Sequence, residues 1–171
     1  MAQKNLNMFG EMIAKVNKSV VIRAFIIVNV KDHPTDIARL VKDRFKISRV
    51  TAVRHLQDLI QEGVLEATGK TKDRRYKLHN LVDRDFVLEV TPKLQEDVVW
   101  TDQIKPLLAE LPENVLGICA HGFTEMLNNV IDHSESTTVL ISIVRNAAQV
   151  EIKVLDKGIG IFRHIQEECK L

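Results

Sequence analysis

Apolar residues in the first third of the chain recur at the three- and four-residue spacing of helices that bury one face. Residues 19–30 are apolar and β-branched, a composition compatible with a strand or a buried helix, and the helices that follow favour a helix. The next helix starts at residues 33–36 and ends near Phe45. After a tight connection, Ser48 is expected to cap another helix, which Gly63 ends. Its apolar positions are predicted to face inward: Val50, Val53, Leu56, Leu59 and Ile60.

Two short strands are predicted next, over residues 64–68 and 74–78, with a turn between them. A helix-turn-helix followed by a basic β-hairpin resembles the winged-helix DNA-binding domains, and the resemblance covers about residues 20–78. In that family the second helix enters the major groove and the hairpin lies against the DNA backbone or the minor groove. The resemblance therefore implies contacts to double-stranded DNA from the following polar residues: Arg49, Thr51, Arg54 and His55 on the helix, and Lys70, Lys72, Arg74 and Arg75 on the hairpin.

Charge is divided unevenly along the chain. Residues 1–80 carry 16 Lys and Arg against 8 Asp and Glu, a net charge of +8, whereas residues 81–171 carry 8 against 15, a net charge of −7. This asymmetry predicts two domains, 1–80 and 81–171, of which the first has an anionic partner. A cluster of Lys and Arg alone is more often a solvated surface, but its position on the helix and hairpin favours DNA. Some winged helices bind protein or RNA instead, and that alternative stays open.

The second half of the chain mixes strand and helix patterns. An edge strand is predicted within residues 81–99, a helix over residues 100–111 and a longer helix that ends near His133. Two paired strands follow, over residues 137–144 and 149–155. The chain is therefore expected to be an α+β protein.

Polar residues share one face of the long helix. His121, Glu125 and Asn129 are spaced by four, and Asp132 lies close beside them. A carboxylate next to neutral amides offers a general base and oxygen ligands, which suit Mg²⁺ held mainly through phosphate and water. Further on, Asp156 ends an apolar strand just before two glycines at alternate positions, which let the backbone approach a ligand closely.

In this order and spacing the two motifs resemble the N box and the G1 box of the GHKL ATPases, a family with the Bergerat fold. The resemblance implies an N-terminal winged helix-turn-helix followed by a truncated Bergerat-type α/β sandwich that binds ATP and Mg²⁺. Asn129 would ligate Mg²⁺, Glu125 would polarise the attacking water, and Asp156 would accept a hydrogen bond from the adenine amine. The remaining residues implied at the nucleotide are Asn128, Asp132, Gly158 and Gly160.

Two features of this resemblance limit the activity that is expected. Asp132 stands where many histidine kinases carry a lysine, which leaves kinase and ATPase chemistry both open. The lid and the second glycine-rich box that grip the triphosphate in the family do not follow Gly160. Because lid amides and a helix N-terminus supply much of the affinity for phosphate, these 171 residues are expected to bind ATP weakly or not at all and to be inactive, even if a full-length protein is an ATPase or kinase.

Composition narrows the remaining possibilities. The two cysteines are isolated and the six histidines lack metal-ligand spacing, so a zinc site is not expected. No apolar run reaches the length of a membrane span and no signal peptide is recognised, which favours a cytoplasmic location without a membrane partner. Residues 1–18 are expected to form an amphipathic helix that either packs on its own domain or mediates a homodimer.

Two functions follow as hypotheses, beside a structural alternative in which both domains only mediate dimerisation. In the first, the chain is a DNA-binding transcriptional regulator with a histidine-kinase-like ATP-binding domain, and the nucleotide state modulates DNA binding. In the second, it is an anti-sigma-like serine kinase or an ATPase whose winged helix docks protein. The basic N-terminal half favours the first hypothesis.

Overall fold

The computed structural model describes residues 18–158, apart from the side chain of Lys72. These residues form two compact units, the first running to Leu81 and including the turn Asn146–Gln149, and the second comprising Val82–Arg145 and the residues from Val150 onward. The first unit opens with a helix over residues 18–29, so the expected helix over residues 19–30 is confirmed. The amphipathic segment predicted for residues 1–18 lies, but for its last residue, outside the described part of the chain.

Two further helices of the first unit form the predicted helix-turn-helix: α2 (Ile37–Phe45) and α3 (Arg49–Gln61). Lys46 ends α2 in the left-handed conformation, at φ 52°. The Ser48 hydroxyl then accepts a hydrogen bond from the Thr51 backbone N–H at 3.0 Å, which caps the first turn of α3 as expected. Gly63, at φ 71°, follows the end of the helix, where a residue without a β-carbon is favoured.

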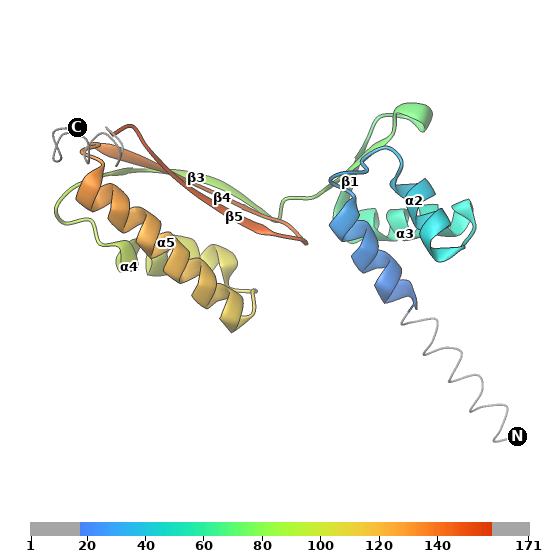
Figure 1. Cartoon of the computed structure of the whole chain (residues 1–171), viewed down its shortest axis with the longest axis horizontal. Helices are drawn as coiled ribbons and strands as arrows, with labels where there is room; N and C mark the ends of the chain where they lie inside the picture. Colours follow the sequence, from blue (N-terminus) through green and yellow to red (C-terminus); the bar gives the residue numbers. More distant parts are fainter. Residues whose placement is uncertain (1–17, 159–171) are drawn as a thin grey trace, which may run out of the picture. The chain divides into compact units, whose positions relative to one another are not determined.

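The hairpin consists of β1 (Leu65–Thr68) and β2 (Arg75–Leu78), which pair antiparallel and are joined through the short 3-10 turn η1 (Thr71–Asp73). It can be followed in Figure 1 beside α2 and α3. Buried Tyr76 attaches the hairpin to the rest of the unit, because its backbone N–H donates to the Pro34 carbonyl at 2.8 Å. The predicted strand, turn and strand are confirmed.

The buried stripe of α3 differs from the one expected. Val50 is 80% exposed and Val53 is only half-buried, so the prediction that both face inward is wrong. Leu56 and Leu59 are buried as expected, and the other buried positions of the helix are Ala52 and His55. Ala52 and Val53 both lie within one turn before Leu56, and the packed structure places the small alanine in the core and turns the larger valine outward.

The elements of the second unit are, in chain order, β3 (Val82–Glu89), α4 (Glu96–Val99), the π-helical turn η2 (Trp100–Ile104), the 3-10 turn η3 (Lys105–Leu108), α5 (Glu113–His133), β4 (Thr138–Arg145) and β5 (Val150–Asp156). The strands form one antiparallel sheet in the order β3-β4-β5. The predicted strands and the end of the long helix at His133 are confirmed. The chain is thus an α+β protein.

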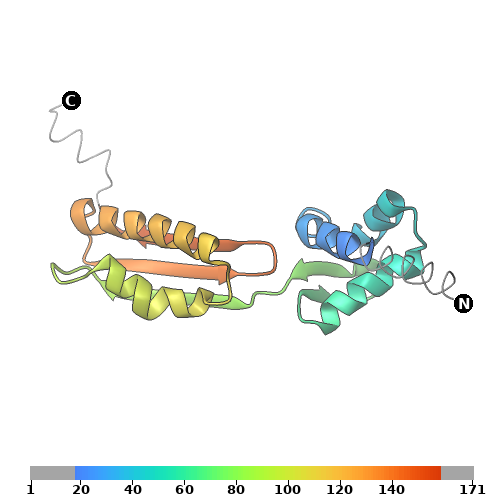
Figure 2. The ribbon, with the colours of Figure 1, turned by 90° about the horizontal axis from the view of Figure 1, so that it is seen from below.

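Helices cover one face of this sheet, as Figure 2 shows. In the central strand β4, alternate residues Val139, Ile141 and Ile143 are fully buried against the helices. Phe123 and Leu127 of α5 fill the same core. The helical register of α5 and the pleat of the sheet therefore decide together which side chains lie between the layers.

The regular helix predicted over residues 100–111 is replaced by a change of helix type. A single α-turn is followed by η2 and then by η3, which begins next to Pro106. Proline has no N–H to donate, so a continuous α-helix through this position would lose a hydrogen bond. Trp100 is nevertheless buried as expected, with its ring 5.9 Å from that of Phe123. No helix within residues 18–158 is both long enough and apolar enough to cross a membrane.

The core of the second unit leads to a stability prediction. Phe123→Ala removes a fully buried ring and is expected to lower the free energy of unfolding by about 3–5 kcal/mol. The matched control on the same helix is Ile118→Ala, whose side chain is 71% exposed and should change stability by no more than about 0.5 kcal/mol. Urea unfolding followed by the fluorescence of Trp100, the sole tryptophan, measures both. Equal losses would contradict the described packing of α5.

A second prediction concerns the buried imidazole of His55, whose Nδ1 atom has no hydrogen-bond partner. Burial lowers the pKa of His55 below its ordinary value of about 6.5. The unfolded chain then binds a proton more readily, so the first unit should lose stability as the pH falls below about 6.5, down to the lowered pKa. Urea titrations followed by the NMR signals of α3 amides should show this loss, and His55→Gln should reduce it. An unchanged pH dependence in the variant would refute it.

Candidate functional site

One exposed face of α3 carries the main candidate site. Five side chains line a single shallow depression on it: Arg49, Val50, Val53, Arg54 and Gln57. Their spacing of three and four residues places them on one side of the helix, opposite the buried stripe. Both arginines are exposed, and no acidic residue is part of this lining. The face can therefore bring two positive charges, an amide and two apolar side chains to a ligand at once.

Two of the residues predicted on this face lie elsewhere. Thr51 is half-buried, and its hydroxyl is 2.8 Å from that of Ser48, so it belongs to the cap of α3. His55 is only 7% exposed and packs inside the unit, so the expectation that it faces outward is wrong. The physical reason is the rotation of α3, which directs His55 to the same side as Leu56 and Leu59.

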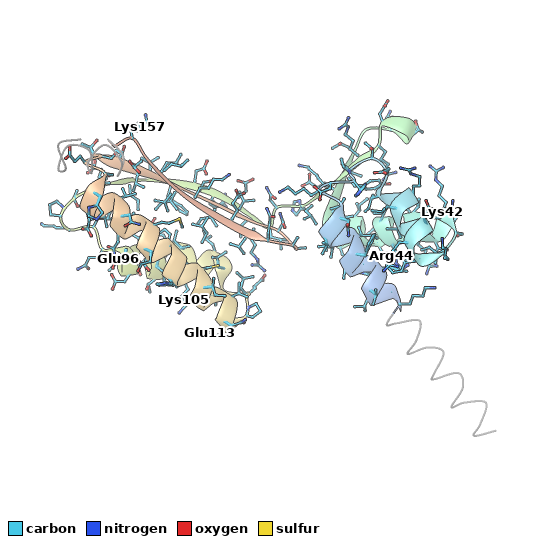
Figure 3. The ribbon with its side chains drawn as sticks, viewed as in Figure 1. Lys42, Arg44, Glu96, Lys105, Glu113 and Lys157 are labelled. Atoms are coloured by element: carbon cyan, nitrogen blue, oxygen red, sulfur yellow. The ribbon has the colours of Figure 1, made fainter. Side chains whose placement is uncertain are left out.

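Helix α2 adds positive charge next to α3. Arg39 and Lys42 line a second depression together with Arg49. Asp36 also lines it, but this carboxylate is bonded to Arg39 at 2.8 Å and to His33 at 3.0 Å. These hydrogen bonds lower the pKa of Asp36 and compensate its charge locally. Figure 3 shows the side chains of this region, with the exposed Lys42 and Arg44 of α2 labelled.

The hairpin presents part of the predicted basic cluster. Lys70 and Arg75 are exposed. Arg74 is half-buried, with its guanidinium 5.4 Å from the centre of the Tyr76 ring, which orients it by a cation–π contact. The side chain of Lys72 lies outside the described residues. The described residues of the predicted cluster thus divide into two exposed charges and one held against the ring, while the exposed Lys77 of β2 is paired with Glu66 at 2.9 Å.

The sequence reasoning missed several residues of this surface. The pattern predicts Val50 and Val53 in the core, and it points to neither Gln57 nor Lys42 as a contact residue. The helical spacing of positions 50, 53, 54 and 57 was readable from the chain. What could not be read was which of two apolar stripes on α3 packs inward.

The second unit has a hollow of its own, of about 270 Å³, between the C-terminal half of α5 and the end of β5. Its lining is Met126, Asn129, Val130, His133, Ser134, Val154 and Asp156. Asn129 and Asp156 are 27 residues apart in the chain, and the fold brings both to this one hollow. The hollow combines an apolar wall with an amide, a carboxylate and an imidazole.

The backbone after β5 lies against the loop after α5. A β-carbon on Gly158 would fall 1.7 Å from the Ser134 carbonyl oxygen, so only glycine fits there. The Gly158 N–H donates to a carboxylate oxygen of Asp156 at 2.8 Å. This bond orients the carboxylate at the rim of the hollow. Gly160 lies outside the described residues.

The other residues predicted at the nucleotide do not line this hollow. The Glu125 side chain is 65% exposed, and its carboxylate oxygen Oε1 is 4.0 Å from Nδ1 of His121. Asp132 is exposed and Asn128 is half-buried. The rotation of α5 explains these positions. The helix directs Met126, Asn129, Val130 and His133 toward the hollow, and therefore directs Glu125, Asn128 and Asp132 to the neighbouring side. Within residues 18–158, no group of three His, Cys, Asp or Glu side chains could hold a metal ion.

Comparison with known proteins identifies one part of the chain. Residues 22–84 match the family model of the winged helix DNA-binding domain. The match spans α2, α3 and the hairpin, and with them the exposed face described above. No curated protein and no solved structure matches the chain. The matched range ends before α5, so the interpretation of the hollow rests on its two motifs and its geometry.

Proposed function

We propose that the chain is a DNA-binding transcriptional regulator that inserts α3 into the major groove of duplex DNA. The observation that carries the proposal is the exposed face of α3, with Arg49 and Arg54 outward, inside a domain that matches the winged helix DNA-binding family. A helix of this diameter fits the major groove, which is about 12 Å wide. Arginine on such a helix can bond a guanine edge or a phosphate.

The charges around α3 support binding to phosphate. Lys42 of α2 and Lys70 and Arg75 of the hairpin are exposed on the elements that flank this helix in the domain. Winged-helix hairpins lie along the DNA backbone or in the minor groove, where such charges displace counterions. The hairpin therefore serves to position the domain, while α3 supplies the contacts to bases.

The DNA proposal predicts a salt dependence that single charges control. The affinity of the protein for duplex DNA should fall steeply as salt is raised from about 50 to 200 mM. Arg54→Ala should weaken binding and reduce the slope of log K against log salt by about 0.9 if Arg54 contacts one phosphate. Fluorescence anisotropy with a labelled random duplex measures both effects.

The matched control is Lys105→Ala, which removes one exposed positive charge from the second unit and should leave affinity and slope unchanged. Absence of binding at every salt concentration would refute the proposal. That result would favour the alternative in which the winged helix docks protein and the chain is an anti-sigma-like serine kinase or an ATPase.

We also propose that the hollow between α5 and β5 is the adenine end of an ATP site. Its support is the convergence of Asn129 and Asp156, one residue from each of the two motifs that resemble the GHKL ATPases. An aspartate at this rim can accept a hydrogen bond from the adenine amine, whereas guanine presents a carbonyl oxygen at the corresponding position. The site should therefore prefer ATP to GTP.

The residues at the hollow fit Mg²⁺ only in combination with phosphate. The Asn129 amide oxygen is a suitable hard ligand, but a single neutral oxygen does not hold the ion without phosphate and water. Mg²⁺ bound in this way would neutralise phosphate charge. Glu125, one turn before Asn129 and largely exposed, would be available to orient a water molecule. A change in DNA affinity with nucleotide state is part of this proposal.

The nucleotide proposal predicts weak and selective binding by these residues. Millimolar MgATP should shift the NMR signals of α5 and β5 residues around the hollow, and MgGTP should shift them less. Asp156→Asn should reduce the preference for ATP, because its amide can turn a donor toward guanine. Glu125→Gln is the control, since Glu125 does not line the hollow and binding should be retained. Unchanged signals with ATP would refute the site, and micromolar affinity would contradict the expected weakness.

A further inference from the structure

Two valines on α3 have no role in the core of the first unit. Val50 is 80% exposed, and neither Val50 nor Val53 belongs to the apolar residues packed around that core. A β-branched residue also lowers helix propensity relative to alanine or a long straight side chain. Folding stability therefore does not account for valine at these two positions, which unlike the exposed Val28 share one face with two arginines and a glutamine.

The surroundings of the valines indicate which ligand this is. They are bordered by Arg49, Arg54 and Gln57, so a small apolar patch lies inside a rim of hydrogen-bond donors without an acidic residue. Valine methyl groups can contact the C5-methyl group of thymine, the one apolar feature of the major groove. Glutamine can bond both edge atoms of adenine, and arginine those of guanine. The five side chains together match the major-groove edge of a site that contains A·T pairs.

The spacing along the helix agrees with this assignment. At about 1.5 Å per residue, Val50 and Val53 are about 4.5 Å apart along the axis of α3, between the rise of one base pair, about 3.4 Å, and that of two. Val50 is in the first turn of α3, the end of a recognition helix that contacts bases. A polyanion fits the face better than a typical protein surface, because its lining has two guanidinium groups and no carboxylate.

From these observations we infer that Val50 and Val53 read thymine methyl groups at neighbouring base pairs, and so determine which DNA sequences the protein prefers. This inference rests on the proposed binding of duplex DNA. It adds a recognised group, the thymine methyl, and two specificity-determining residues that contribute no charge.

The test separates the methyl contact from DNA binding in general. Preferred sites are first selected by the full chain from a random duplex pool, and each thymine in them is then replaced in turn by deoxyuridine, which removes only the methyl group. Loss of a contacted methyl should weaken binding about fourfold, as expected for burial of one such group. The Val50→Ala variant should discriminate less between thymine and deoxyuridine at one contacted position. The Val53→Ala variant should show the same loss of discrimination at the neighbouring position.

Val28→Ala is the matched control, because Val28 is a 70% exposed valine on the first helix of the same unit and should leave the discrimination intact. The inference is overturned if the protein binds duplex DNA but tolerates deoxyuridine everywhere, selects no preferred sequence, or keeps full discrimination in both alanine variants. Absence of DNA binding at low salt would overturn the proposed function as well. Circular dichroism confirms that each variant is folded.

Discussion

The rotation of α3 about its own axis is the constraint on which the first unit depends. Ala52, Leu56 and Leu59 are almost fully removed from solvent, and burial of such side chains contributes about 1.5–3 kcal/mol for each large one. Turning the helix would expose them and bury Arg54 without a partner, at a far greater cost. The outward direction of Arg49, Val50 and Gln57 follows from this burial, although none of the three adds to it.

The ends of α3 are held as well as its sides. Ser48 caps the first turn, and the Arg23 guanidinium binds the Glu62 carboxylate with one bond of 2.9 Å, which links the first helix to the end of α3. A partly exposed ion pair adds only a fraction of a kcal/mol, so its effect is on position more than on stability. A helix held at both ends can present a small set of side chains with little loss of entropy on binding.

In the second unit, too, the burial of apolar side chains decides which residues face outward, here through the pairing of strands in a sheet. The pairing of β4 with β5 sets Ile141 opposite Val154 and places alternate side chains of both strands under the helices. Asp156 then emerges at the end of β5, next to the face of α5 that carries Asn129. The close approach of Gly158 to the Ser134 carbonyl requires a residue without a β-carbon at this point. The geometry of the hollow thus depends on pairing register and on one glycine.

Periodicity and turn residues were enough to identify most of the elements. The helix-turn-helix, the hairpin, the three later strands and the end of α5 could all be predicted, because caps, glycines and alternating apolar residues act over a few neighbouring positions. The irregular segment from Trp100 to Leu108 was missed, although Pro106, which has no N–H to donate, disfavours a continuous α-helix through it.

What the chain determined by itself was therefore local: where helices and strands begin and end, and that the first half is basic. Which stripe of α3 faces inward was decided by tertiary packing. Both His55 and Val53 can lie at the edge of a buried helix face, and only the contacts with the rest of the core bury His55 and leave Val53 partly exposed. The meeting of Asn129 and Asp156 was likewise decided by the sheet, since residues so far apart in sequence come together only when strand register and helix rotation are both set.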